Sequence, residues 1–437
     1  MSANPFAGPD LHAPAPDDID LSDFHFWARP LHERETAFAT LRAHRPVPFY
    51  AEPLTVPGFE RGPGYYALTR HADIYEASRR PEEFRSGQGA TSITDMPEEF
   101  REYFGSMIEL DDPRHTRLRK IVSRGFTPRM LKRVQGQVEA SATTIVDDIA
   151  EQGTCDFVTD VAARLPLKII CDMMGIPGAD YDFVFDRTNV ILGFGDPEYV
   201  AESDDIATAL LRAGGELTQL VSDLGRYRAE EPADDLISAL VNANVDGESL
   251  TDAELASFFI LLVVAGNETT RNAMSHGLRL LTQNPDQHRL WASDFERYAP
   301  TAVEEIVRVA SPVIWMRRTV SRNTELNGQS FAQGDKLLLF YWSGNRDEDV
   351  FDDPQRFDIA RDPNPHVGFG GPSPHFCLGA HLARREITVM FRELFDRLPD
   401  IHATGEPDRL RSNFINGIKH LPAAFTPATT VSGGKSQ

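Results

Sequence analysis

Hydrophobic and polar residues follow two different periods along this chain. Apolar residues recur every three to four positions over most of its length, which predicts amphipathic helices. The segments with this period are 113–124, 129–151, 165–174, 206–230, 251–282 and 302–308. Shorter runs near 47–50, 64–69, 313–320 and 336–340 are alternating or β-branched and are bounded by Gly, Pro or Asn. The pattern therefore predicts a mostly α protein with small β-sheets.

The segment 251–282 is the strongest predicted helix. It opens with Thr251 and Glu254 at the spacing of a capping box. The run 258–264 is apolar on every side, which predicts a helix buried in the middle of the protein. Polar residues from Asn267 onward end this run well short of the roughly 20 residues that a membrane span needs. We therefore expect a core helix.

Length and composition favour one large globular unit. The chain has 437 residues, of which 41% are hydrophobic and 25% are charged. Because it contains no long linker and no internal repeat, we expect a single domain over residues 18–427. Residues 1–17 and 428–437 are expected to be disordered on composition. The first twenty residues have neither a basic segment nor an apolar run, so we expect no signal peptide and no membrane anchor.

The formal net charge of −22 argues against a nucleic-acid binder. One stretch, 114–133, nevertheless carries basic residues and no acidic residue. Its basic members are Arg114, Arg117, Arg119, Lys120, Arg124, Arg129, Lys132 and Arg133. Two interpretations remain open, a docking surface for an acidic partner and a solvated helix face without a partner.

The three cysteines, Cys155, Cys171 and Cys377, form no disulfide framework, so a reducing cytoplasm is the expected compartment. Cys377 ends a stretch rich in Gly and Pro and is followed by a helix-like segment from Ala380. A cysteine just before a helix N-terminus is well placed to be a thiolate, because free N–H groups and the helix dipole stabilise negative charge there. The alternative is a buried structural cysteine.

The stretch 369–379 resembles the haem-binding loop of the cytochrome P450 superfamily, although Phe369 stands one residue farther from the cysteine than is common. The resemblance implies that Cys377 is the axial ligand of haem iron and favours O–O cleavage. It also implies that His375 binds a haem propionate and that Gly379 lets the next helix approach the porphyrin. The implied fold is a triangular prism with a long central helix over the haem.

Residues 265–270 place a small residue, a carboxylate and a hydroxyl inside the long apolar helix. A mid-helix Thr can bond back to a carbonyl one turn earlier, so the sequence predicts a polar notch in a dry site. The resemblance implies that Ala265 lies at the haem, that Thr269 holds dioxygen and its water, and that Glu268 relays protons. The structural alternative is a Glu268 paired with an arginine and a Thr269 without a role.

Two further sets of residues match the superfamily. Glu305 and Arg308 stand three residues apart on one helix face, where a surface ion pair would be the plain interpretation. The resemblance implies that they form a structural triad with Arg356 that locks the cysteine loop. It also implies that the haem propionates are bound by His115 and Arg119 from one helix, by Arg318 from a strand, and by His375. Each cation taken alone would be solvated.

Together these matches imply a haem-dependent monooxygenase that puts one oxygen atom of O₂ into an unactivated C–H bond. The cofactor would be haem b, iron protoporphyrin IX. The chain lacks the cysteine clusters of an iron–sulfur centre. Electrons from NAD(P)H are therefore expected through a separate ferredoxin and ferredoxin reductase, with the ferredoxin docking on 114–133. We expect a monomer.

The substrate is expected to be hydrophobic, because the implied distal wall, Leu261, Val264, Val313 and Ile314, is apolar. The segments 189–197, 258–271 and 364–371 are similar to actinobacterial members of the superfamily that hydroxylate terminal methyl groups of methyl-branched lipids and sterol side chains. The favoured reaction is ω-hydroxylation of a methyl-branched lipid, isoprenoid or sterol side chain. The alternatives are a tailoring hydroxylase of a macrolide or terpenoid and a haem-thiolate protein that binds a ligand without turnover.

Overall fold

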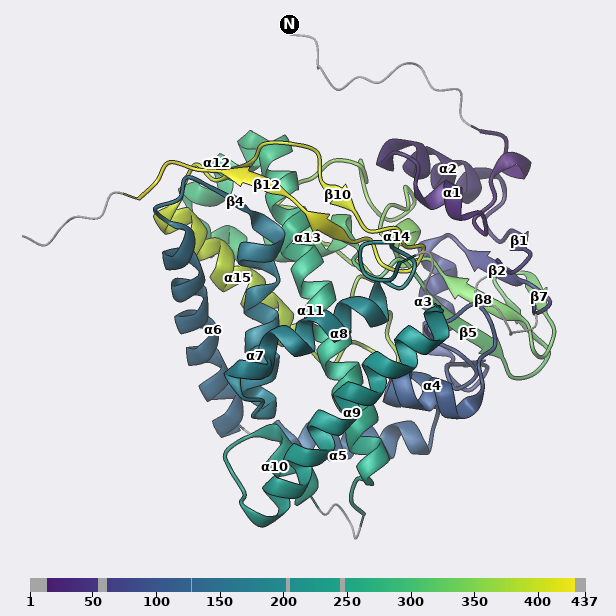
Figure 1. Ribbon diagram of the computed structural model, residues 1–437. Helices are drawn as coiled ribbons and strands as arrows, with labels where there is room; N and C mark the ends of the chain where they lie inside the picture. Colours follow the sequence, from purple (N-terminus) through teal and green to yellow (C-terminus); the bar gives the residue numbers. More distant parts are fainter. Residues whose placement is uncertain (1–13, 54–60, 127, 202–204, 244–247, 429–437) are drawn as a thin grey trace, which may run out of the picture.

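A computed structural model of the chain describes residues 14–53, 61–126, 128–201, 205–243 and 248–428 (Figure 1). It is mostly helical with small sheets, as the sequence predicts. Order extends beyond the expected domain boundaries. Pro16–Asp18 form a 3₁₀ turn, and the N–H of Ala428 donates to Ala150 O at 2.8 Å. Residues 1–13 and 429–437, also expected to be disordered, lie outside the described residues.

The α-helices are α1 Phe24–Trp27, α2 Leu31–His44, α3 His71–Arg79, α4 Glu98–Gly105, α5 Arg114–Gly125, α6 Pro128–Ile149, α7 Arg164–Met174, α8 Tyr181–Leu192, α9 Ile206–Glu230, α10 Leu236–Val241, α11 Asp252–Gln283, α12 Pro285–Ser293, α13 Phe295–Ala310, α14 Tyr341–Gly344 and α15 Ala380–Arg397. The strands are β1 Phe49–Tyr50, β2 Tyr65–Leu68, β3 Phe84–Arg85, β4 Thr154–Asp156, β5 Met316–Val320, β6 Thr324–Leu326, β7 Gln329–Phe331, β8 Lys336–Leu339, β9 His402–Ala403, β10 Asp408–Arg409, β11 Ile418–His420 and β12 Pro422–Ala424.

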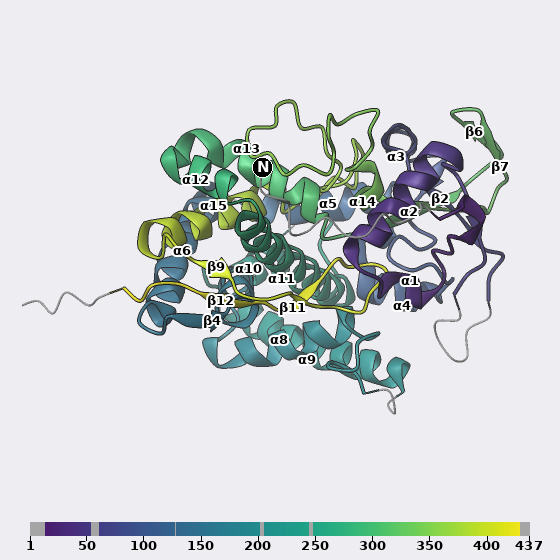
Figure 2. The same ribbon diagram turned by 90° about the horizontal axis from the view of Figure 1, so that it is seen from above.

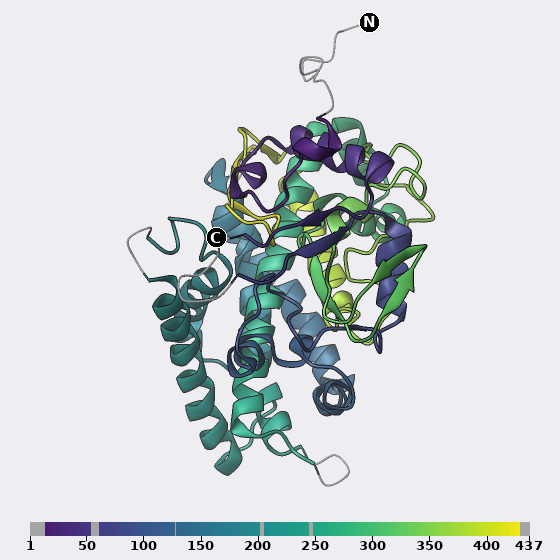
Figure 3. The same ribbon diagram turned by 90° about the vertical axis from the view of Figure 1, so that its right-hand side faces the viewer.

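The largest sheet has the strand order β1-β2-β8-β5-β3. Strand β2 pairs with β8 in parallel, and the other neighbours are antiparallel. This sheet and the helices around it lie on one side of the molecule, while long helices fill the other side (Figures 1 and 3). Smaller sheets join β4 to β12 and β9, β10 to β11, and β6 to β7.

The predicted long helix is α11, which runs through the middle of the molecule (Figures 1 and 2). Its capping box is formed as predicted. The N–H of Glu254 donates to Thr251 Oγ1 at 3.1 Å, and the N–H of Thr251 donates to Glu254 Oε2 at 2.9 Å. By length and composition this helix could cross a membrane, but more than half of its most apolar window is buried inside the protein. It packs against α4, α7, α9 and α13, which makes it the core helix of the fold.

Most other predicted elements differ from the structure by a few residues at their ends. The largest difference is α13, which begins at Phe295 although only 302–308 was predicted. Asp294 caps its first turn by accepting the N–H of Arg297 at 3.3 Å, and the helix continues through Pro300. Strand β5 begins at Met316 because Val313 forms only an isolated bridge with Ile415.

Candidate active site

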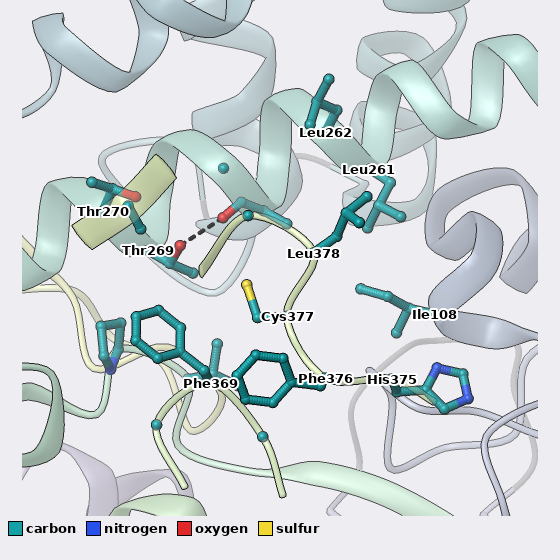
Figure 4. A pocket seen from close by; sticks show the side chains of 18 of the residues that line it. Ile108, Leu261, Leu262, Thr269, Thr270, Phe369, His375, Phe376, Cys377 and Leu378 are labelled. Carbon is teal, nitrogen blue, oxygen red and sulfur yellow. Dashed lines mark hydrogen bonds between the residues drawn. The ribbon is translucent and has the colours of Figure 1, made fainter. Parts of the chain in front are cut away.

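A cavity of about 250 Å³ lies between α11, the loop before α15, α5 and β5 (Figure 4). Many residues singled out in the sequence line this cavity. They are His115, Arg119, Leu261, Ala265, Thr269, Val313, Arg318, Phe369, His375, Cys377 and Gly379. Segments that are far apart in the chain therefore form one site, as the resemblance implies.

Two expected wall residues lie elsewhere. Ile314 is 1% exposed and packs in the core with Trp315 and Phe340. Its neighbour Val313 faces the cavity, and successive side chains in extended backbone point to opposite sides, so Ile314 points away. Val264 packs against the main core cluster and is not among the residues that line the cavity.

Cys377 points into the cavity from the loop that precedes α15 (Figure 4). Its N–H donates to Phe369 O at 3.0 Å, which closes the loop. Burial raises the pKa of the Cys377 thiol, whereas the N–H groups of Gly379 and Ala380 and the charge of Arg119 lower it. Burial raises the pKa of Cys155 and of Cys171 to about 12, with no backbone donor opposing it. The pKa of Cys377 is raised overall and its side chain is exposed to the cavity, so the feature it shares with a thiolate ligand is its position beside backbone N–H donors and Arg119.

Cationic groups converge at one edge of the cavity. The rings of His115 and His375 lie 4.2 Å apart between centroids. Burial and then the charge of Arg318 lower the pKa of His375 to about 2, and burial lowers that of His115. Both ring nitrogens of His115 are buried and have no hydrogen-bond partner among the described residues, although Asp112 Oδ1 lies 3.8 Å from Nδ1. Buried donors beside Arg119 and Arg318 need an anion, and haem propionates fit this requirement.

Gly379 tests the fit of a flat cofactor. A Cβ added there would meet nothing within 4 Å, so it would project into open space at a position that lines the cavity. The ring of Phe369 also lines the cavity, and the Arg384 guanidinium lies 4.3 Å from its centroid. A thiol, an open glycine face and two arginines that donate to backbone carbonyls, Arg119 to Phe376 O and Arg318 to Arg317 O, together suit haem.

The polar notch in α11 contains the predicted hydrogen bond from a threonine hydroxyl to a carbonyl one turn earlier. Thr269 Oγ1 donates to Ala265 O at 2.7 Å, and Thr269 lines the cavity (Figure 4). Glu268 points elsewhere, where it pairs with Arg271 and accepts from Asn272 Nδ2 at 2.8 Å. Arg271 also donates to Asn189 Oδ1 of α8 at 3.0 Å. Glu268 therefore has the arginine pairing that was the structural alternative, and it does not line the cavity.

The structural triad contains a different arginine from the expected one. Arg308 donates to Glu305 through Nε at 2.7 Å and Nη2 at 2.8 Å, and Arg361 Nε lies 3.2 Å from Glu305 Oε2. The side chain of Arg356 is 61% exposed and reaches only Asp358, at 3.8 Å. The N–H of Arg356 donates to Asp353 O in a tight turn, and the side chain of Arg356 points outward. The contact of Arg356 with Arg308 is through the backbone, because the carbonyl of Arg356 accepts from Arg308 at 3.2 Å.

Glu386 is a cavity residue that sequence reasoning missed. It is 2% exposed, its Oε1 atom has no partner in the described part of the chain, and burial raises its pKa to about 8. A signal was present in the sequence. Glu386 lies four residues after Leu382 and four before Met390, so it is a charged residue on an apolar helix face.

The basic stretch 114–133 is less open than its sequence suggests. Arg114 pairs with Glu102, Arg117 pairs with Glu248 and Glu254, and Arg133 pairs with Asp234. These acids lie outside the stretch 114–133, so a local run of basic residues does not give a cationic surface of the same extent. Arg124 and Lys132 are exposed.

Comparisons with known proteins agree with this geometry. The family model described as Cytochrome P450 matches residues 297–414. The chain is 52% identical over 412 residues to a methyl-branched lipid omega-hydroxylase of Mycobacterium tuberculosis, covering 94% of this chain and 95% of that protein. It is 40% identical over 424 residues to a steroid C26-monooxygenase of Mycolicibacterium smegmatis, covering 96% of each. Among solved structures, a Mycobacterium marinum cytochrome P450 in complex with pseudoionone has a TM-score of 0.87 and 44% identity, covering 95% of this chain and all of that chain.

Proposed function

The chain belongs to the cytochrome P450 family and is a monooxygenase, and from that premise we propose that it hydroxylates the terminal methyl group of a methyl-branched lipid. The observation that carries the proposal is the apolar cavity that separates Thr269 from Cys377 (Figure 4). The names of the relatives, an omega-hydroxylase of methyl-branched lipids and a C26-monooxygenase of steroids, support a chain end as the reacting group. A sterol side chain is the second candidate substrate for the same reason.

The apolar part of the cavity wall suits a hydrophobic substrate. Its wall is formed by apolar side chains from several elements, with Thr269 and Thr270 as hydroxyl groups on α11. The apolar lining includes Met107, Ile108, Phe258, Leu261, Leu262, Val313 and Met316. Such a surface holds a lipid by burial and excludes water from the reacting end.

We assign Cys377 as the ligand of haem iron and His115, Arg119, Arg318 and His375 as the groups that hold its propionates. Haem supplies the activation of O₂ when it is bound. Thr269 lies at the notch in α11, where its hydroxyl can position a water for proton delivery. Glu268 can accept a proton from solvent and pass it on only after its carboxylate leaves Arg271, since that pair holds it outside the cavity.

A bacterial enzyme of this family needs electrons from redox partners. We propose a ferredoxin and a ferredoxin reductase that draw electrons from NAD(P)H, in the cytoplasm. The docking face would be α5 and α6, where Arg124 and Lys132 are exposed. Replacing both with Glu is expected to slow reduction by an acidic ferredoxin and to weaken its salt dependence. An unchanged reduction rate would remove this face from the proposal.

The test of the substrate is an optical titration of the haem-loaded protein, followed by turnover. The panel is a methyl-branched fatty acid, a linear fatty acid of equal length, a cholestenone-type sterol and a macrolide. We expect saturable conversion from low to high spin with the branched lipid, and an ω-hydroxylated product in a reconstituted assay. A response to the macrolide alone would favour a tailoring hydroxylase, and saturable binding without any product would favour a non-catalytic ligand-binding protein.

A further inference from the structure

Four arginines from separate elements are buried together away from the haem cavity. They are Arg34 of α2, Arg279 of α11, Arg346 after α14, and Arg409 of β10, and we call them the arginine cluster. Arg34 is 5% exposed, Arg279 is 7% exposed and Arg346 is 2% exposed, while Arg409 is half-buried. No member lines the cavity that holds Cys377. The cluster is therefore a separate feature of the molecule.

Hydrogen bonds at the C-terminal end of α13 link the segment after α14, the segment 410–417 and α11. Arg346 Nη2 donates to Val309 O at 2.7 Å, and Asn416 Nδ2 donates to the next carbonyl, Ala310 O, at 2.6 Å. His276 Nε2 lies 2.9 Å from Asn416 O, which places α11 at the same point. Strand β10 is held there through the segment 410–417, whose two ends are joined by a backbone bond of 3.1 Å.

Positive charge exceeds negative charge at this point. Among the described residues Glu35 is the carboxylate bonded to the cluster, at 3.3 Å from Arg346 Nε. Burial and then the charge of Arg409 lower the pKa of Arg34 and of Arg279 to about 10, so the arginines repel one another. Glu406 adds a second negative charge that acts on Arg279 and Arg409 from an exposed position. Among the described residues, the carboxylates that act most on these four guanidinium groups are Glu35 and Glu406.

Several donors in the cluster have no acceptor. Arg34 Nε, Arg279 Nε and Arg409 Nη1 are buried without a partner in the part of the chain that the structure describes, and so is Nδ1 of His276. Arg279 donates through Nη1 to Gln283 Oε1 at 2.7 Å, which is a neutral acceptor. A buried cation without a counter-charge is strongly unfavourable. Water can accept these hydrogen bonds, but it does not supply the missing negative charge.

We propose that the arginine cluster is a binding site for an inorganic oxyanion of the phosphate class. Planar guanidinium groups donate paired hydrogen bonds that match the oxygens of such an anion. The bound anion would join α2 and β10 to the C-terminal halves of α11 and α13, and so stabilise the junction between the sheet side and the helical side. This role does not depend on the substrate of the haem site.

The test measures thermal unfolding of the full-length, haem-loaded protein against inorganic phosphate at constant ionic strength, with sodium chloride as the balancing salt. We expect a saturable rise in Tm, because a ligand that binds only the folded state stabilises it by mass action. Arg34→Gln is expected to weaken phosphate binding about tenfold or more, since a charged hydrogen bond is worth roughly 1.5–3 kcal/mol. Arg164→Gln, which removes a surface pair with Asp148 at 2.6 Å, is the matched control and should respond like the wild type.

A second expectation separates an anion site from a set of structural ion pairs. In buffer free of phosphate, Arg34→Gln should unfold at the same temperature as the wild type or a higher one, because it removes a repelling charge. If Arg34→Gln does not fold, Arg409→Gln at the half-buried rim provides the same measurement. The absence of a saturable response in the wild type, an equal response in the variant, or an equal saturable response to chloride would each overturn the proposal.

Discussion

Glu386 is a carboxyl group that has its proton because of burial. Its pKa is raised to about 8, so the folded state binds this proton more tightly than the unfolded state does. The contribution to stability is therefore complete below the unfolded pKa of about 4.3 and is lost as pH rises through about 8. As pH rises from 6 to 9, we therefore expect the unfolding temperature to fall less in Glu386→Gln than in the wild type.

The measurement is Tm of the haem-loaded protein across that pH range. Glu393→Gln, on the same helix but only half-buried, is the control and should keep the wild-type pH profile. Parallel profiles for the wild type and Glu386→Gln would show that Glu386 is already ionised at pH 6.

Thr269 can be tested by the balance between electrons consumed and product formed. Thr269→Ala removes the hydroxyl that the structure shows bonded to Ala265 O. The water that delivers protons should then be positioned less well. We expect NAD(P)H consumption to continue while hydroxylated product falls by roughly tenfold or more and hydrogen peroxide rises. Thr282→Ala removes a similar back-bond, to Leu278 O at 2.9 Å, far along the same helix. Its coupling should match the wild type, and loss of coupling in both variants would argue for a general effect on the helix.

At the scale of elements, Arg308 and Arg361 both connect α13 to the segment 352–361. Arg361 is 11% exposed at its side chain and pairs with the fully buried Glu305. Because Glu305 keeps its two bonds from Arg308, Arg361→Gln should lower the unfolding free energy by about 1.5–3 kcal/mol, the worth of a charged hydrogen bond, and speed haem loss. Arg356→Gln changes an exposed side chain and should stay within about 0.5 kcal/mol of the wild type. Urea unfolding checks both, and a larger effect at Arg356 would contradict the placement of the triad.

The elements and most site residues could be predicted because their signals are local. Helical period and the Thr251 capping box fix α11, and the motif around Cys377 fixes the loop. The predictions that were wrong concern the direction of single side chains, which no local sequence pattern determines. Ile314 packs in the core although its neighbour Val313 lines the cavity, and Arg361 replaces Arg356 because a turn aims one side chain outward. Glu268 pairs with Arg271 on its own helix, a contact that spacing alone permits but does not require.

At the scale of the whole molecule, residues 196–198 after α8 are linked by hydrogen bonds and ion pairs to the segment 411–420, which includes β11. Asp196 accepts the N–H of Arg411 at 3.0 Å and lies 3.2 Å from Lys419 Nζ. Glu198 lies 2.8 Å from Lys419 Nζ and 3.1 Å from His420 Nε2, and Asp156 lies 2.5 Å from His420 Nδ1. We expect this segment to open for substrate entry, as loops near such sites do. These ion pairs are therefore placed to slow its opening.

The ion pairs of His420 with Asp156 and Glu198 should weaken as pH rises. The hydrogen bond with Asp156, and then the charges of Asp156 and Glu198, raise the pKa of His420. Protonated His420 stabilises the folded state. This stabilisation is complete below about pH 6.5, the pKa of an unperturbed histidine, and is lost as pH rises through the raised pKa. Because half-exposed ion pairs are worth about 0.2–1 kcal/mol, Glu198→Gln should speed association of a branched fatty acid about 1.5- to 5-fold at pH 6, and by less at pH 8.5. Stopped-flow detection of the spin change measures this rate, with Glu139→Gln, which removes a surface pair with Arg385, as the control. An association rate that is the same in Glu198→Gln and the wild type at pH 6 would mean that opening of this segment does not limit substrate entry.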